Sequence, residues 1–331
     1  MVYVFKKVVS GKSYYYLRVS SRKGSKVISK DVAYLGSTVV EVKEALSKLP
    51  KFKKDIDKAY RKINQVLESN RFLEEVHKAK PKADDFLGDN LFFIEACALH
   101  FNQVFNKLDS LTKKEIFDNF VIEFAFNTTS IEGNTIDLKE ARELLEEGLT
   151  PKGKTLREIY DLQNTKKVFE ALDLNKELSH ELIKKIHADL LENIDVRTEY
   201  RTRDIIVTKS RFKSTPFHLV KSDMDLLIKW YFDNKNKLHP FVLAVIFHHK
   251  FEKIHPFMDG NGRTGRMLMN FILMKNKYPP VIIKNKNRSE FLDALSTADE
   301  SFVTGIKVEQ YSELVKFVAA ELNETYWNNF L

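Results

Sequence analysis

The first part of the chain, residues 1–36, alternates apolar and polar positions in short runs. Val, Ile and Tyr are frequent in these runs, and turn signals separate them at Ser10-Gly11 and at Lys23-Gly24. Short β-prone runs between such turns are typical of hairpins. The pattern therefore predicts a small antiparallel sheet of about three strands.

The spacing of apolar positions then becomes helical. A charged segment that starts at Lys51 predicts a solvated helix, and Pro81 interrupts the pattern beyond it. We therefore divide the chain into a small β module at 1–36, a helical linker at 37–89 and a main domain at 90–331.

The main domain consists of repeated apolar segments of helix length, so the fold is predicted to be mainly α. The predicted helices span about 90–108, 112–132, 137–148, 153–175, 179–193, 221–235, 239–254, 263–277, 287–300 and 307–326. One stretch, residues 205–216, departs from this pattern. It is β-prone at its start, broken at Lys209-Ser210 and closed by Pro216, which predicts a β-hairpin.

Composition excludes several classes of protein. The chain has 331 residues with 54 Lys and Arg against 46 Asp and Glu, a net charge of +8, and its 43% apolar residues are enough for a packed core. Global disorder is therefore excluded. The single cysteine, Cys97, excludes a disulfide-stapled secreted domain and fits a reducing cytoplasm.

The apolar runs are short. The amino terminus reaches Lys6 and Lys7 after five apolar residues, too few for a signal peptide. The densest apolar stretches elsewhere fall well short of the ~20 residues that span a bilayer. We expect a soluble, cytoplasmic protein without a membrane partner.

The predicted sheet combines basic and aromatic residues. Arg18, Arg22, Lys23, Lys26 and Lys30 accompany three consecutive tyrosines at 14–16. Such a mixture can contact nucleic acid. Lysine-rich edges also protect small sheets from aggregation, and we prefer this simpler interpretation.

The richest chemistry lies in residues 255–266, HPFMDGNGRTGR, between two apolar helical segments. Gly260, Asn261 and Gly262 let the backbone approach a ligand closely and open the next helix, whose positive dipole end favours an anion. Arg263 and Arg266 are three positions apart on that helix and can both grip phosphate oxygens. The pattern is typical of a polyphosphate site.

Two further side chains of this segment supply the other groups that a transfer reaction needs. Asp259 is a natural ligand for a Mg²⁺ ion that bridges phosphates. The imidazole of His255 can accept a proton from a hydroxyl near neutral pH. A general base, a metal ligand and a phosphate-binding segment together indicate the transfer of a group from a nucleoside triphosphate.

Other interpretations of these residues are weaker. Residues 260–265 match the dinucleotide fingerprint GxGxxG, but a predicted helix precedes them where that motif needs a strand. His248 and His249 with His255 suggest zinc, yet the two adjacent histidines point to different sides of a helix, and core histidines are the simpler hypothesis. A second HPF triplet at 239–241 lacks the glycines and arginines, and we interpret it as a helix start.

Residues 255–266 resemble the HxFxDGNGRxxR signature of the Fic family of nucleotidyltransferases at every defined position. The resemblance extends over about residues 90–325. It implies a helical Fic fold that transfers AMP from ATP to a Ser, Thr or Tyr hydroxyl of a target protein and of the enzyme itself. The hairpin at about 205–216 would be the family's flap, which binds the target protein by strand addition.

The resemblance also implies a role for each motif residue. Phe257 would anchor the loop in the core, and His255 would be the general base. Asp259 would hold Mg²⁺, and Arg263 together with Arg266 would stabilise the departing diphosphate. The α- and β-phosphates of ATP would lie against Gly260, Asn261 and Gly262.

A second motif, TTSIEGN at residues 128–134, is similar to the family's inhibitory pattern. Glu132 lies near the end of the predicted helix 112–132, and Gly133 is a suitable residue to end it. In the family this glutamate pairs with the second arginine, here Arg266, and displaces the triphosphate. The alternative is an ordinary surface glutamate.

Several alternatives stay open. A Fic-like chain could transfer another phosphate-containing group or remove AMP from a target, and residues 1–36 could make the chain a nucleic-acid-bound regulator. Phe291 falls where many members have a Tyr near the adenine, so stacking on the base is expected to survive. Self-association that buries the inhibitory helix would regulate the enzyme.

Overall fold

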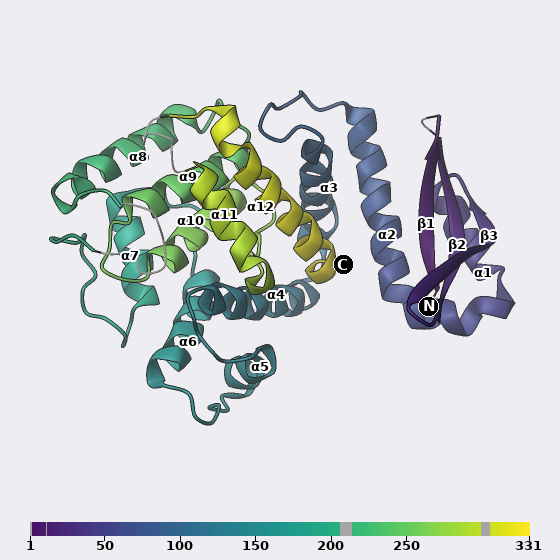
Figure 1. Ribbon diagram of the computed structural model, residues 1–331, viewed down its shortest axis with the longest axis horizontal. Helices are drawn as coiled ribbons and strands as arrows, with labels where there is room; N and C mark the ends of the chain where they lie inside the picture. The colour runs from purple at the N-terminus through teal and green to yellow at the C-terminus, as the bar shows by residue number, and fades with distance from the viewer. Residues whose placement is uncertain (1, 11, 206–213, 299–304) are drawn as a thin grey trace. The chain divides into compact units, whose positions relative to one another are not determined.

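The computed structural model describes residues 2–10, 12–205, 214–298 and 305–331 (Figure 1). They form two compact units, residues 1–81 and residues 82–330. Each unit is described by itself.

The first unit is a three-stranded antiparallel sheet with helices on one face. Its elements are β1 (Val2–Val9), β2 (Lys12–Lys23), β3 (Lys26–Gly36), α1 (Val39–Ser47), the 3-10 helix η1 (Pro50–Phe52) and α2 (Lys53–Ala79), with strand order β1-β2-β3. The predicted sheet is confirmed. Alternate strand residues such as Val4 and Leu17 share a core with Ile63 and Leu67 of α2, so this helix buries one face instead of being solvated all round.

The second unit is helical, which confirms the mainly α prediction. Its elements are α3 (Asn90–Gln103), η2 (Phe105–Lys107), α4 (Ser110–Ile131), α5 (Leu138–Glu147), α6 (Leu156–Glu170), α7 (His180–Leu190), η3 (Phe217–Leu219), α8 (Val220–Asn234), α9 (Pro240–Ile254), α10 (Asn261–Lys275), η4 (Asn285–Asn287), α11 (Arg288–Ala298) and α12 (Val308–Asn329). Every helix predicted in this part overlaps an observed one.

Helix α9 is the centre of this unit (Figure 1). Its residues 241–251 are all buried, and it packs along α8, α10 and α12. The helix starts as expected at the first HPF triplet, where the His239 side chain accepts a hydrogen bond from the Phe241 amide at 3.2 Å. It ends at His255, whose φ of 52° turns the chain into the loop before α10. The motif loop is therefore held between two buried helices.

Helix α4 brings a distant segment to this loop. It packs against α6, α10 and α12, and the Phe124 ring lies 4.7 Å from the Phe169 ring of α6. The helix ends at Ile131, and Gly133 follows with a φ of 105°, a conformation that favours glycine. This end of α4 faces the first turn of α10 and carries Glu132 to the loop.

The predicted hairpin is described only at its margins. Residues 206–213 lie outside the described residues, and residues 201–205 and 214–216 contain no strand. In the described part of the chain, no helix is both long and apolar enough to cross a membrane.

Candidate active site

The loop between α9 and α10 is fixed by its own side chains. The Asn261 side-chain oxygen accepts a hydrogen bond from the Phe257 amide, and its side-chain nitrogen donates to the Phe257 carbonyl, both at 2.9 Å. The Phe257 ring is fully buried and stacks on the ring of His187 of α7 at 3.6 Å. His187 also reaches the Asp259 carbonyl at 2.9 Å. The buried Phe257 is thus the anchor of the loop.

His255 carries its ring proton on Nδ1. Its Nδ1 lies 3.2 Å from the Glu252 carbonyl oxygen, which can only accept, so this bond places the proton on Nδ1 and leaves the lone pair on Nε2. Burial lowers the pKa of His255, although the carboxylates of Glu132 and Asp259 act in the opposite direction. The imidazole is therefore neutral at pH 7.

Arg201 holds the backbone around this histidine. Its buried guanidinium donates to the His255 carbonyl at 2.8 Å and to the carbonyls of Ile254 and Thr215. The Arg201 amide donates to the Pro256 carbonyl at 2.9 Å. One side chain thereby connects the end of α9 to both margins of the predicted hairpin.

The start of α10 forms a cradle for an anion. Gly260 has a φ of 73°, and a Cβ there would lie 2.8 Å from Leu191, so both conformation and space require glycine. The first-turn amides of a helix have no partner within the helix and point toward a ligand. The absence of a side chain at Gly262 makes room for the Glu132 carboxylate, which a Cβ there would overlap.

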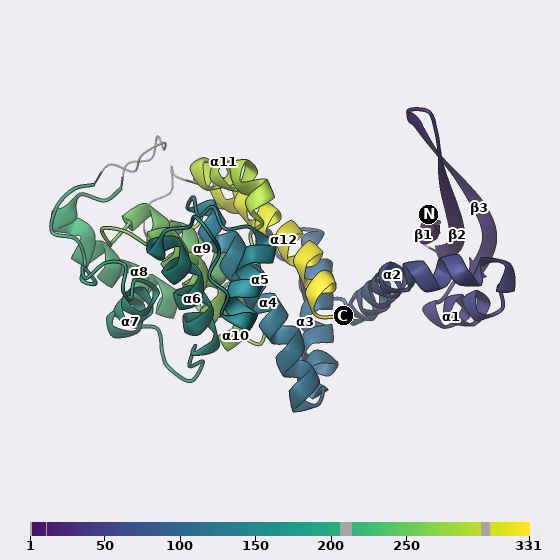
Figure 2. The same ribbon diagram turned by 90° about the horizontal axis from the view of Figure 1, so that it is seen from below.

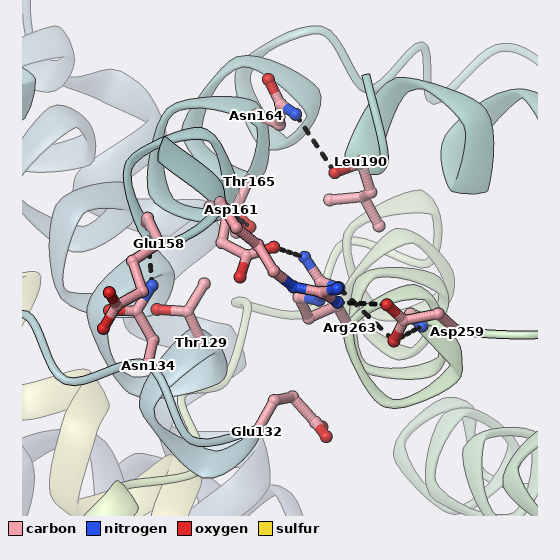
Figure 3. A network of polar contacts seen from close by, with 12 residues as sticks. Thr129, Glu132, Asn134, Glu158, Asp161, Asn164, Thr165, Leu190, Asp259 and Arg263 are labelled. Atoms are coloured by element: carbon pink, nitrogen blue, oxygen red, sulfur yellow. Dashed lines mark hydrogen bonds and ion pairs between the residues drawn. The ribbon is translucent and has the colours of Figure 1, made fainter. Parts of the chain in front are cut away.

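Arg263 is buried between two carboxylates (Figure 3). It forms an ion pair with Asp161 of α6, and its second terminal nitrogen lies 4.0 Å from Asp259. The Nε atom of Arg263 is buried without a partner among the described residues. A buried donor of this kind is costly unless a ligand or water satisfies it.

The Asp259 side chain is partly exposed. Its side chain is 34% exposed, pairs with Arg157 of α6 and accepts a hydrogen bond from the Gly260 amide at 2.6 Å. Although burial acts against its charge, the hydrogen bond from Arg157 lowers the pKa of Asp259. The group is an ionised oxygen donor at neutral pH.

The donor set fits Mg²⁺ that arrives with a nucleotide. Among the described residues, no group of three or more His, Cys, Asp or Glu side chains could hold a metal ion. Mg²⁺ is commonly held by one or two carboxylates together with substrate phosphates and water. Asp259, beside the cradle, could supply the protein's share of such a set.

Arg266 is bound to the end of α4. Its Nε donates to the Thr128 hydroxyl at 2.7 Å, and one terminal nitrogen donates to the Thr128 carbonyl at 3.0 Å and to Glu132 Oε1 at 2.6 Å. The Arg266 side chain is 4% exposed, whereas that of Glu132 is 43% exposed. Desolvation opposes the charge of Glu132, but attraction and hydrogen bonding from Arg266 lower its pKa. The glutamate is therefore ionised and lies against Gly262, where the cradle would receive an anion.

Phe291, the residue expected to stack on adenine, lies inside the core. Phe291 is 1% exposed, and its ring packs between those of His248, at 5.8 Å, and Phe317, at 5.7 Å. The ring is thus enclosed by the core. The expectation that Phe291 stacks on a base is therefore wrong for this structure.

The predicted site residues otherwise lie together. The loop and the first turns of α10 carry His255, Asp259, Gly260, Asn261, Gly262, Arg263 and Arg266, and α4 adds Glu132. Sequence reasoning missed Arg157, Asp161 and Arg201. A signal existed for the first two, because opposite charges four positions apart share one helix face.

Comparisons with known proteins agree with this geometry. A model of the Fic/DOC family matches residues 177–273, which include α9, the loop and most of α10 but not Glu132. Protein adenylyltransferase fic-1 of Caenorhabditis elegans is 30% identical over 208 residues, which cover 60% of this chain and 41% of that protein. Protein adenylyltransferase Fic of Aedes aegypti is 34% identical over 193 residues, 54% of this chain and 37% of that protein. The chain thus spans about two fifths of the length of these curated relatives.

Solved structures share the fold. A Fic domain containing signaling protein from Bacteroides thetaiotaomicron has a TM-score of 0.65 at 25% identity, covering 72% of this chain and 96% of that chain. Fic-1 from C. elegans has a TM-score of 0.61 at 24% identity, covering 88% of this chain and 82% of that chain.

Proposed function

We propose that this chain, whose residues 177–273 belong to the Fic/DOC family, is a protein adenylyltransferase that Glu132 holds inactive. It would transfer AMP from ATP to Ser, Thr or Tyr hydroxyls of a target protein and of itself. The names of its relatives support the activity. The observation that carries the proposal is one loop that joins a neutral histidine to an anion cradle in which a carboxylate of the same chain already lies.

In this mechanism His255 removes the proton from the attacking hydroxyl. The Nε2 lone pair takes the proton as the hydroxyl oxygen forms a bond to the α-phosphorus of ATP. The bond between that phosphorus and the bridging oxygen to the β-phosphate breaks, and diphosphate leaves with the electron pair. General base catalysis of this kind contributes about 10²- to 10⁴-fold to a rate.

The start of α10 would bind the phosphates. Backbone amides at Gly260–Gly262 would face the α- and β-phosphate oxygens, and Arg263, oriented by Asp161, would neutralise charge that develops on the diphosphate. Asp259 would hold Mg²⁺, which would neutralise phosphate charge. Because the loop is fixed before the nucleotide arrives, little reorganisation is needed.

Inhibition would follow from competition for Arg266. A triphosphate needs this guanidinium for its γ-phosphate, and Glu132 already pairs with it at 2.6 Å. The same carboxylate would repel phosphate oxygens at the cradle. Displacing it requires breaking a charge-assisted hydrogen bond worth about 1.5–3 kcal/mol, which corresponds to about 10- to 100-fold in activity.

The segment 205–216 would recognise the target protein. Its margins are fixed next to His255 by Arg201, which contacts the His255 and Thr215 carbonyls. Strand addition at this place would bring a hydroxyl of an extended target segment beside the base.

The test uses ATP labelled at the α- or the γ-phosphate, with Mg²⁺ and a cell lysate. We compare wild type, Glu132→Gly, His255→Ala and, as a matched control, Glu147→Gly, which removes an exposed glutamate at the end of another helix. Protein-bound α-label should be weak in wild type and in the control, about 10- to 100-fold stronger in Glu132→Gly, and absent in His255→Ala.

Each other outcome rejects a part of the proposal. Label from the γ-phosphate indicates a phosphotransferase. Equal α-label in wild type and Glu132→Gly rejects inhibition by this residue. If wild type, but not Glu132→Gly, removes AMP from a protein that Glu132→Gly has labelled, then Glu132 is needed for AMP removal. Absence of label in all variants rejects transfer from ATP.

A further inference from the structure

The net charge of the chain is concentrated in its first 36 residues. They contain eight Lys and Arg residues and one acidic residue, Asp31, whereas the whole chain has a net charge of +8. The remaining 295 residues are thus close to neutral. Transfer of AMP at the loop before α10 gives no reason for this concentration.

Part of this charge lies on a hairpin that extends beyond the sheet (Figure 2). Strand β1 pairs with β2 only from Lys12 to Val19, whereas β2 and β3 remain paired from Ser20↔Ser29 to Lys23↔Lys26. Residues 20–29 therefore form a two-stranded ribbon, which Gly24 closes with a φ of 63°.

The ribbon exposes cations together with small apolar groups. Arg22 and Lys26 are exposed, as is Lys30 at its base, and residues 12–30 contain no Asp or Glu. In the pairing register Arg22 and Lys26 belong to opposite faces of the ribbon. Val27 is 69% exposed and Ile28 is 39% exposed, so the tip offers apolar contacts between flanking charges.

The sheet face below the ribbon carries aromatic rings. The helices of this unit share a core with the residues of one face, including Tyr15 and Leu17. Tyr14, Tyr16 and Tyr34 belong to the other face, where the Tyr34 ring lies 5.4 Å from that of Tyr16 and 6.5 Å from that of Tyr14. Tyr34 is 55% exposed.

We propose that residues 20–29 enter the major groove of duplex DNA. The groove is about 12 Å wide and admits a two-stranded ribbon. Cations on both ribbon faces suit the phosphates of its two walls, and Val27 and Ile28, which share those two faces near the tip, can contact thymine methyl groups. The tyrosines below the ribbon can donate hydrogen bonds to the adjacent backbone. Duplex DNA is favoured over single strands because the Tyr34 ring packs against the other two tyrosine rings, so the three do not stand apart to receive bases.

The test measures binding of the full chain to a fluorescent 30-base-pair duplex as a function of salt. The variant Arg22→Ala/Lys26→Ala/Lys30→Ala is compared with Lys54→Ala/Lys58→Ala/Lys62→Ala, which removes the same charge from exposed positions on α2 of the same unit. The ribbon variant should lose at least about tenfold in affinity, and its salt slope should fall by about 0.9 per lost phosphate contact. The α2 variant should bind like wild type, and circular dichroism should show both variants folded.

Any one of three results would overturn the proposal. The first is that wild type does not bind the duplex, and the second is that both variants lose affinity equally. The third is that single-stranded DNA, RNA or phosphatidylserine vesicles bind more tightly than the duplex. None of these measurements uses ATP, so they stand apart from the test of adenylyl transfer.

Discussion

At the scale of single residues, three arginines of the site each have a carboxylate partner distant in sequence. Arg157 pairs with Asp259, Arg263 with Asp161, and Arg266 with Glu132. The partners differ in exposure, because the Asp161 side chain is 12% exposed and that of Glu132 is 43% exposed. The exposed Glu132 carboxylate keeps more of its hydration and therefore leaves at less cost than the buried Asp161, although either departure leaves a buried guanidinium that needs another anion. Of these two pairs, the Glu132 pair is the more exchangeable one, and a phosphate could take its place at Arg266.

Asp161→Asn should reduce stability strongly, because it leaves the buried Arg263 guanidinium with only the more distant Asp259, at 4.0 Å, as a counter-charge. We expect a loss of about 3 kcal/mol in the free energy of unfolding. Arg157→Ala is the matched control, since the Arg157 side chain is 55% exposed and its loss should cost less than about 1 kcal/mol. Urea unfolding of both variants measures the difference. Equal losses would show that Asp161 is no structural counter-ion.

The pH dependence of transfer should report the buried His255. Transfer needs the neutral imidazole, and burial lowers its pKa, so kcat/KM of Glu132→Gly should be flat from pH 8 down to about 6.5 and fall only below that. Since the charge of Glu132 raises the pKa of His255, the falling limb of wild type should lie at higher pH than that of the variant. Rates between pH 5 and 8.5 at constant ionic strength test this. An apparent pKa above 6.5 in the variant would contradict it.

At the scale of elements, the sequence predicts most of the fold. Apolar periodicity located the helices because their buried faces are continuous, as in α9 with residues 241–251 all buried. The pattern predicts that α10 starts at residue 263, but the helix begins at Asn261, since its glycine-rich first turn carries no apolar signal. Likewise, the pattern predicts a solvated α2, because the charged residues of this helix outnumber the apolar residues of its buried face.

The residues of the motif could be predicted from the sequence, but the distant residues that hold them in place could not. His255 and the residues up to Arg266 are close in sequence, so their common site follows from spacing alone. Asp161 lies 102 positions before Arg263, and Arg201 lies 54 before His255, so only tertiary packing brings them together. The flanking sequence of Phe291 likewise does not reveal that His248 and Phe317 cover its ring.

The contact between α4 and α10 should be measurable as a coupling energy. Alanine at position 262 would overlap the Glu132 carboxylate in wild type, and should destabilise the chain. In Glu132→Gly the nearest of the remaining contacts is the flexible Arg266 side chain, at 3.1 Å, and Gly262→Ala should then be neutral or stabilise by up to about 1 kcal/mol. A double-mutant cycle of unfolding free energies should give a coupling of about 1–2 kcal/mol. Additive effects would mean that Glu132 does not lie against Gly262.

At the scale of the whole molecule, charge and chemistry are divided between the two units. The basic sheet and its ribbon belong to residues 1–81, and the candidate site belongs to residues 82–330. Each unit has apolar residues that bury one another, as in the core of the sheet with α1 and α2. Units of this kind commonly fold alone. The two proposals therefore concern separable parts of one chain.

Removal of residues 1–81 should separate the two activities. The fragment 82–331 with Glu132→Gly should remain helical by circular dichroism and should incorporate α-label from ATP at the rate of the full-length variant, because every residue assigned to the site lies within it. The same fragment should no longer bind the DNA duplex, because it has lost the basic ribbon. The full chain with Arg22→Ala/Lys26→Ala/Lys30→Ala is the control, since it should also transfer AMP without binding DNA. A folded fragment that fails to transfer AMP would show that the first unit contributes to catalysis, and a fragment that still binds the duplex would assign the DNA contact to the helical unit instead.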